Sequence, residues 1–320
     1  VFRSRELLTA RQKTRWLLER TTQIGAPVGE APVFDAAAYH EKFNRVRDYI
    51  ASGDVYQVNL TMRLPLHAPT DVMDCYRVLS ERARAGACSL LHFEDEDVLS
   101  LSPEQFFTAR EGRLTVRPMK GTVPRKPTPE ADRAQVAALQ SDPKQRAENL
   151  MIVDLMRNDI SRLCKPGSVR VDDLFTVETY PTFHTLTSGI SGALSGPATF
   201  GSLLPALFPC GSVTGAPKIR AMEIIREIED GPRGVYCGAI GHGSPDGLAF
   251  NVAIRTISVR DGVTQMGVGG GIVWDSEAAQ ELDECKLKAR FFTDVARSEE
   301  HTSELQSPCN LVCRLLLEKK

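Results

Sequence analysis

Lys120 is the residue of this sequence whose surroundings most suggest covalent chemistry. It lies in residues 118–125, PMKGTVPR, where Pro118 and Pro124 restrict the backbone and Gly121 lets a ligand approach closely. A lysine amine that has lost its proton can attack an electrophilic carbon. Taken alone, the segment fits a tight turn with a solvated lysine better, so the choice depends on the other residues.

Two further side chains could move protons. Glu104 follows Ser102 and Pro103 at the end of a predicted strand. A glutamate in that position is normally solvated, but in a cleft it could serve as a general acid. His184 lies in the predicted strand 183–194. A single histidine on a strand is more often a hydrogen-bonded structural residue than a catalyst.

Three glutamates could bind a divalent cation. Glu281 and Glu284 share one face of a predicted helix with Lys288, because the three stand at positions i, i+3 and i+7. Glu148 stands beside an apolar run, where a carboxylate without a cation is costly. Three carboxylates suit Mg²⁺, which prefers oxygen ligands. The alternative is a solvated Glu–Lys pair on the helix surface.

Other residues could bind an anion. Arg255 lies inside the predicted strand 249–259, and a buried arginine needs an anionic partner. Gly269, Gly270 and Gly271 are consecutive in a predicted strand and could direct backbone N–H groups at a carboxylate.

The predicted strand 56–64 carries a row of polar residues, Gln57 among them, that alternates with apolar ones. This polar face is either solvated or lines a cleft. Residues 211–218, GSVTGAPK, resemble a phosphate loop superficially, but their spacing does not match one. They are better interpreted as a loop that leads into a helix.

The elements that must position these side chains do not alternate as strand, helix, strand. Apolar spacing and capping residues predict helices that begin near residues 35, 71, 128, 142, 199, 217 and 276. Alternation predicts strands at residues 56–64, 89–93, 97–102, 105–110, 113–117, 168–171, 173–179, 183–194, 234–240, 249–259 and 265–273. Runs of strands between scattered helices predict an α+β fold with a mainly antiparallel sheet layer.

Composition excludes several classes of protein. The 320 residues have a formal net charge of -2, without a basic run or the motif of a nucleic-acid-binding module. No uninterrupted apolar stretch reaches the length of a membrane span, and no signal peptide opens the chain. We therefore expect a soluble, cytoplasmic protein with reduced cysteines and with no nucleic-acid or membrane partner.

Residues 35–296 are expected to form one catalytic domain. Residues 1–34 are interpreted as the remnant of a truncated N-terminal region, followed by a linker rich in proline and glycine. Residues 297–307, RSEEHTSELQS, match the translation of a sequencing-library adapter. We therefore expect residues 297–320 to be non-biological and exclude them from the fold.

Taken together, these segments resemble the chorismate-utilising enzyme family. The resemblance covers residues 37–295 and rests on ordered motifs: GDVYQVNL at 53–60, SPE at 102–104, PMKGT at 118–122, AENLMIVD at 147–154, RND at 157–159, GSVTGAPK at 211–218, NVAIRT at 251–256 and GGGI at 269–272. It implies a large orthogonal antiparallel β-sandwich flanked by helices, with the active site in a cleft between the layers.

The resemblance also implies a role for each candidate residue. Lys120 would attack ring carbon 2 of chorismate while Glu104 protonates the departing 4-hydroxyl, and His184 would assist proton transfer near the ring. The residues that would bind Mg²⁺ are Glu148, Glu281 and Glu284. The residues that would hold the substrate are Gln57, Thr122, Tyr236, Arg255, Gly269, Gly270, Gly271 and Lys288.

Two positions distinguish the branches of the family. Gln57 stands where members that add water carry a lysine base, which argues against isochorismate or salicylate formation. Lys120 stands where anthranilate-forming members usually carry alanine, and where the branch that aminates carbon 4 carries lysine. We therefore expect a Mg²⁺-dependent amination of chorismate to 4-amino-4-deoxychorismate, on the way to 4-aminobenzoate and folate.

Ammonia for this reaction has to come from a partner, because the sequence lacks the G-x-C-x-G motif of a glutaminase. A separate or upstream glutamine amidotransferase is implied. Gln145 stands three residues before Glu148, where relatives often have Asp or Glu, and this change could weaken Mg²⁺ binding. The alternatives are an anthranilate-forming enzyme, a non-catalytic chorismate-binding subunit and an inactive fragment.

Overall fold

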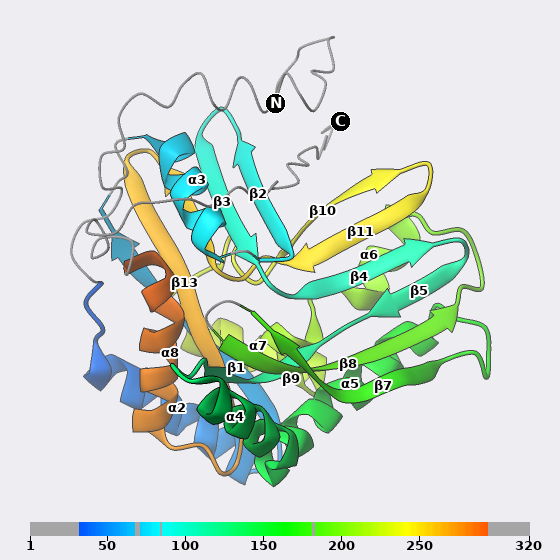
Figure 1. Ribbon diagram of the computed structural model, residues 1–320, viewed down its shortest axis with the longest axis horizontal. Helices are drawn as coiled ribbons and strands as arrows, with labels where there is room; N and C mark the ends of the chain where they lie inside the picture. Colours follow the sequence, from blue (N-terminus) through cyan, green and yellow to red (C-terminus); the bar gives the residue numbers. More distant parts are fainter. Residues whose placement is uncertain (1–31, 68–70, 84, 181–182, 294–320) are drawn as a thin grey trace.

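Two antiparallel β-sheets form the centre of the molecule (Figure 1). The computed structural model describes residues 32–293, apart from residues 68–70, 84 and 181–182. The first sheet consists, in spatial order, of β2 (Ala87–His92), β3 (Glu96–Ser102), β12 (Thr256–Arg260), β13 (Val263–Ile272), β1 (Gln57–Leu66) and β9 (Gly215–Ala216). The second consists of β10 (Ala239–Ser244), β11 (Gly247–Val252), β4 (Gln105–Arg110), β5 (Arg113–Val116), β8 (Phe183–Ala193) and β6 (Met119–Pro124), with β7 (Arg170–Thr179) also paired to β8.

The chain passes directly from a strand of one sheet to a strand of the other at two crossings that lie side by side; it also changes sheets through helical segments, between β8 and β9 and between β9 and β10. Residues 103–104 connect β3 of the first sheet to β4 of the second, and residues 253–255 connect β11 of the second to β12 of the first. The crossings are hydrogen-bonded to each other, from Leu101 N to Arg255 O and from Val252 N to Glu104 O, both at 3.1 Å. Strands that switch sheets in this way make the corner of a sandwich.

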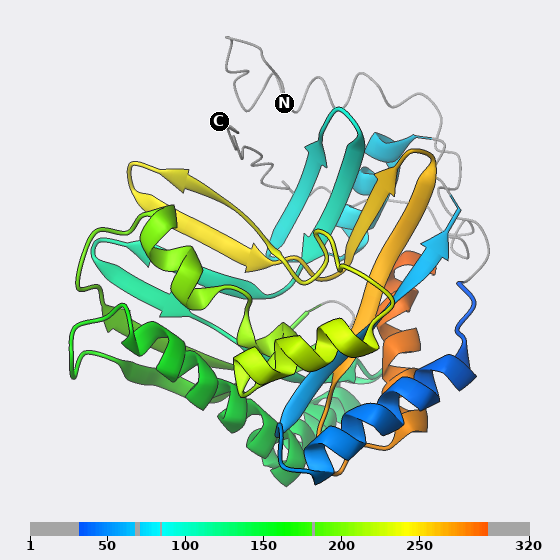
Figure 2. The same ribbon diagram turned by 180° about the vertical axis from the view of Figure 1, so that it is seen from behind.

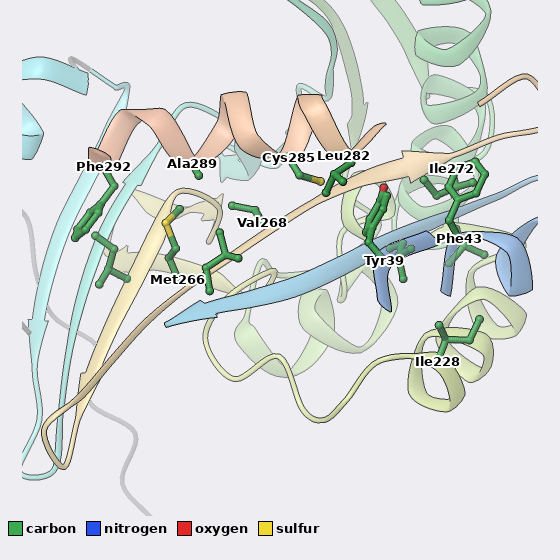
Figure 3. Packing of buried hydrophobic residues seen from close by; sticks show 14 of the residues in the cluster. Tyr39, Phe43, Ile228, Met266, Val268, Ile272, Leu282, Cys285, Ala289 and Phe292 are labelled. Carbon is green, nitrogen blue, oxygen red and sulfur yellow. The ribbon is translucent and has the colours of Figure 1, made fainter. Parts of the chain in front are cut away.

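Four helices cover the outer face of the first sheet: α2 (Ala36–Ala51), α3 (Val72–Ala83), α7 (Lys218–Ile228) and α8 (Ala278–Thr293). Asp35 caps α2 by accepting a hydrogen bond from Ala38 N at 2.9 Å. The apolar spacing of α2 buries Tyr39 and Phe43 on one face. Figure 3 shows this core, in which Leu282 and Cys285 of α8 lie between the helix and β13.

The second sheet has its own core. Helices α4 (Pro129–Ser141), α5 (Pro143–Ser161) and α6 (Phe200–Leu207) flank this part of the fold (Figure 2). Ile152, Met156 and Ile160 of α5 pack into the core beneath β8. Among the described residues, no helix is long and apolar enough to cross a membrane. The expected α+β fold with an antiparallel sandwich flanked by helices is confirmed.

Three local predictions were wrong. Residues 249–259 are not one strand, because the chain bends at residues 253–255 and continues in the other sheet. Strand β10 begins at Ala239, so most of the predicted strand 234–240 lies outside it. Residues 119–124 are a strand and not a tight turn, since β6 pairs with β8. A bulge interrupts this pairing at Gly121, whose φ is 73°.

Candidate active site

A cavity of about 200 Å³ lies beside the crossings, between the two sheets. It is lined by parts of β6, β13, α5 and α8, together with both crossings. Most of the residues selected from the sequence line this one cavity: Glu104, Lys120, Thr122, Glu148, Tyr236, Arg255, Gly269, Gly271, Glu281, Glu284 and Lys288. The fold thus brings together segments that are far apart in the chain.

The amine of Lys120 lies over the backbone of β13. A Cβ atom added to Gly271 would stand 2.7 Å from Lys120 Nζ and 3.2 Å from Gln57 Nε2. Only a residue without a side chain leaves this space for the amine. Among the described residues, no acidic side chain forms an ion pair with Lys120. The amine is therefore available to a ligand in the cavity.

Glu104 is a buried carboxyl at the first crossing, with 4% of its surface exposed. Burial raises its pKa to about 7, against the opposing effects of a hydrogen bond from Ser212, the charge of Lys120 and the backbone N–H of Met119. Glu104 Oε1 is buried without a hydrogen-bond partner. A carboxyl that changes protonation near neutral pH beside an unpaired amine is suited to acid–base catalysis.

Arg255 occupies the second crossing in a strained backbone conformation, with φ of 50°. Its guanidinium lies 4.4 Å from the centre of the Phe183 ring, and no acidic side chain among the described residues pairs with it. Burial lowers the pKa of Arg255 to about 10. A buried cation that faces a cavity without a counter-ion is suited to an anionic ligand.

Tyr236 lines the same cavity as Arg255. Its ring packs against β13 at Gly267, where an added Cβ would stand 2.1 Å from ring atom Cδ1. Gly267, like Gly271, is therefore required by the side chain that lies over it.

The acidic residues of α8 already have partners. Glu281 Oε1 accepts a hydrogen bond from Ser276 at 2.7 Å, and Glu284 pairs with Lys288 at 2.6 Å. Burial raises the pKa of Glu281. Burial acts in the same direction on Glu284, but the charge of Lys288 outweighs it and lowers the pKa. Lys288 also donates to the carbonyl of Gly269 at 2.7 Å.

Glu148, Glu281 and Glu284 face one cavity, yet they do not form a ready metal centre. In the part of the chain that the structure describes, no three acidic, histidine or cysteine side chains are gathered closely enough to hold a metal ion. Their chemistry still fits Mg²⁺, since all three offer carboxylate oxygens.

Three of the selected residues do not line the cavity. His184 Nε2 lies 2.9 Å from Asp132 of α4, and Nδ1 lies 2.9 Å from Thr179 of β7. The ring is therefore held in a structural network on the side of β8 that faces α4. Gly270 lies near Glu281, and Gln57 is fully buried with both polar side-chain atoms lacking hydrogen-bond partners.

The cavity also contains residues to which the sequence assigned no individual role. Ser212 and Lys144 line it, and so does Asn59. Ser212 belongs to the motif at residues 211–218, which was interpreted as a loop before a helix and as one of the motifs of the family resemblance. Asn59 lies on the polar face of β1, on which Gln57, Asn59 and Thr61 are buried whereas Arg63 is exposed to solvent.

Comparison with known proteins gives independent information. A model of the chorismate binding enzyme family matches residues 9–294. Aminodeoxychorismate synthase component 1 of Klebsiella aerogenes is 44% identical over 274 residues, which cover 84% of this chain and 61% of that protein. Anthranilate synthase component 1 of Streptomyces coelicolor is 42% identical over 271 residues, which cover 82% of this chain and 52% of that protein.

A solved structure gives a similar result. Anthranilate synthase component I from Streptococcus pneumoniae matches with a TM-score of 0.77 and 31% identity, over 90% of this chain and 67% of that chain. The chain spans little more than half the length of the curated relatives, 52% and 61% of the two named above. The family match includes residues 9–34, which the sequence placed before the catalytic domain. The predicted adapter-derived tail lies outside the described residues.

Proposed function

Because this chain belongs to the chorismate binding enzyme family, we propose that it is the chorismate-converting part of an aminodeoxychorismate synthase. It would join chorismate and ammonia to give 4-amino-4-deoxychorismate, a precursor of 4-aminobenzoate and folate. The observation that carries the proposal is the position of Lys120, whose unpaired amine shares a cavity with the buried carboxyl of Glu104.

We propose that these two groups carry the reaction that the family resemblance implies. The Lys120 amine forms a bond to ring carbon 2, the bond from carbon 4 to its hydroxyl breaks, and the hydroxyl takes the Glu104 proton and leaves as water. Ammonia then forms a bond to carbon 4 while the bond from carbon 2 to Lys120 breaks. The new ammonium group returns a proton to the Glu104 carboxylate, so both residues end in their starting state.

The charged residues around the cavity would orient the substrate, which carries two carboxylates. Arg255 and Tyr236 would hold the enolpyruvyl carboxylate, aided by the backbone of the glycines of β13. Lys288 and Thr122 would position the ring carboxylate. His184 would act at a distance, by fixing β8 against α4 through its bond to Asp132.

Mg²⁺ would bind to Glu148, Glu281 and Glu284, and when bound it would supply positive charge opposite the ring carboxylate. Glu281 and Glu284 would first have to release Ser276 and Lys288. The buried carboxyl of Glu281, whose pKa is raised by burial, supports a cation site here.

A second component would supply ammonia. The Klebsiella relative is named component 1, and we propose that the partner of this chain is a glutamine amidotransferase. The relative named anthranilate synthase supports a second candidate, formation of anthranilate, in which Lys120 would have no covalent role.

Product identification tests the proposal. The chain is incubated with chorismate, Mg²⁺ and ammonium, and the products are separated and identified by mass and ultraviolet spectrum. We expect 4-amino-4-deoxychorismate, and its loss in Lys120→Ala. Lys286→Ala is the matched control, because this exposed lysine of α8 contacts only Asp283 in the described structure. Anthranilate as the product, unaffected by Lys120→Ala, would exclude the lysine mechanism.

A further inference from the structure

We infer that Asn149 is a positioning residue for Glu148, and that its hydrogen bonds with β8 hold the carboxylate of Glu148 at its place in the cavity. The inference rests on the proposed function, in which Glu148 binds Mg²⁺. It gives a role to a residue of the motif at 147–154 that the proposed reaction does not use.

Asn149 connects α5 to β8 through both ends of its side-chain amide. Ser188 Oγ donates to Asn149 Oδ1 at 2.6 Å, and Asn149 Nδ2 donates to the carbonyl of Leu186 at 3.4 Å. Ser188 Oγ in turn accepts from the backbone N–H of Phe175 in β7 at 3.2 Å. Asn149 is 1% exposed and Ser188 is fully buried, so little water competes for these bonds. A buried polar network of this kind specifies one arrangement of the elements that it joins.

The place of Asn149 along the helix makes this anchor important for Glu148. Asn149 is the first buried residue of α5, and the buried apolar residues begin only at Ile152. The preceding turns carry Gln145 and Glu148 into the lining of the cavity, ahead of the apolar core. Apolar packing has no preferred direction, whereas an amide that must meet a donor and an acceptor allows one register. Because Glu148 directly precedes Asn149 on the helix, fixing the amide also fixes the direction of the carboxylate.

The same part of α5 contacts the strand that carries Lys120. An added Cβ at Gly121 would stand 2.6 Å from Gln145 Oε1, so the helix lies directly on the bulge of β6. Leu186, whose carbonyl accepts from Asn149, is the register partner of Lys120. The anchor therefore sets where the candidate metal ligand stands relative to the strand of the lysine.

Binding of Mn²⁺ tests this arrangement, with Mn²⁺ in place of Mg²⁺ because free Mn²⁺ is measured by electron paramagnetic resonance. The full chain is titrated without chorismate or ammonia. Asn149→Leu and Ser188→Ala should each raise the Mn²⁺ dissociation constant about 10-fold, the lower end of the loss when groups that orient metal ligands are removed. Glu148→Gln, which removes a proposed ligand, should raise it further.

Two further variants separate positioning from stability. Ser100→Ala removes a fully buried hydroxyl that pairs with Thr256 at 2.9 Å in the first sheet, and it should lower the melting temperature without changing the Mn²⁺ dissociation constant. Asn149→Leu combined with Ser188→Ala leaves no unpaired amide, so its melting temperature should lie above that of Ser188→Ala alone. Its Mn²⁺ dissociation constant should nevertheless stay raised about 10-fold.

A purely structural role would give a different result. Recovery of the wild-type Mn²⁺ dissociation constant in the double variant would overturn the inference. If Asn149→Leu does not fold, a wild-type dissociation constant in Ser188→Ala would overturn it instead. Wild-type binding in Glu148→Gln would remove Glu148 as a ligand and the inference with it. The titration needs no turnover, so it is decided separately from the identity of the product.

Discussion

At the scale of single residues, Glu104 should control how the reaction depends on pH. Its pKa is raised to about 7 by burial, so the carboxyl holds its proton below that pH and loses it above. A general acid must be protonated, and kcat/KM should therefore fall as pH rises through about 7. Glu104→Gln should reduce the rate about 10²–10⁴-fold and remove this alkaline limb.

The profile is measured from about pH 6 to about pH 9, with free ammonia held constant because ammonium itself titrates over this range. When the concentration of free ammonia is constant, any change of kcat/KM with pH comes from groups of the enzyme. An alkaline limb that persists unchanged in Glu104→Gln would show that another group is the acid.

Gly271 offers a second test at this scale, because its missing side chain makes room for the lysine. Gly271→Ala would place a Cβ 2.7 Å from Lys120 Nζ and displace the amine. A misplacement of about 1 Å can cost about 10²-fold in rate, and we expect a loss of that order in kcat with the fold retained. Gly201→Ala is the control, since nothing lies within 4 Å of its Cβ position. Equal kcat in Gly271→Ala and Gly201→Ala would mean that the reaction does not depend on the observed position of the Lys120 amine.

At the scale of elements, an ion pair fastens the end of α7 to β1. Glu229 accepts from Thr61 N and Thr61 Oγ1, each at 2.8 Å, and pairs with Arg233 at 2.6 Å. Arg233 also donates to the carbonyls of Asn59 and Val213, both at 2.6 Å. Because Asn59 and Val213 line the cavity, this pair connects the stability of the helix end with the shape of the site.

Arg233→Met should therefore be strongly destabilising. The substitution leaves the buried carboxylate of Glu229 without its cation, which should lower the free energy of unfolding by about 3–5 kcal/mol. Each kcal/mol lost should lower the Tm by roughly 2–4 °C. Lys286→Ala breaks an exposed pair with Asp283 and should cost at most about 1 kcal/mol. Chemical unfolding measures both, and adding Glu229→Gln to Arg233→Met should recover part of the loss. If Arg233→Met and Lys286→Ala lowered the free energy of unfolding by similar amounts, the buried Glu229–Arg233 pair would not have this stabilising role.

The elements differ in how far the sequence could predict them. Helices α2 and α8 were predicted because apolar residues recur along one face, which is a local pattern. The break between β11 and β12 was missed because Ala253 and Ile254 continue an apolar run without a Gly or Pro signal. What bends the chain there is tertiary, namely the pairing of Arg255 O with Leu101 N across the corner.

The same distinction holds for the candidate site. The acidic residues of α8 could be placed on one face from their spacing alone. The direction of His184 could not, because it depends on which face of β8 is turned to the cleft, and pairing with β6 and β7 decides that. The family resemblance identified the site residues, but their hydrogen-bond and ion-pair partners could be identified only from the folded structure.

At the scale of the whole molecule, the two crossings join the hydrophobic cores of the two sheets into one structural unit. The larger hydrophobic clusters lie on separate sheets, and a small cluster of Val98, Ile240 and Ala253 lies near the corner. The short connections of the corner join β3 to β4 and β11 to β12, so one sheet cannot unfold without pulling on the other. The cavity with Glu104 and Arg255 depends on this corner, and its geometry therefore requires both cores.

This arrangement predicts cooperative unfolding of residues that lie in different sheets. Ile257→Val in β12 and Ile190→Val in β8 each remove one methyl group from a side chain that is at most 1% exposed. Each should cost about 0.5–1.5 kcal/mol and lower the Tm by a few degrees. Because the corner joins the two sheets, both variants should shift the same single transition, and the double variant should show roughly the sum. Calorimetry and circular dichroism on each variant provide the measurement. A transition that splits in two, with Ile257→Val moving one part and Ile190→Val the other, would show that the sheets unfold independently and that the corner does not couple them.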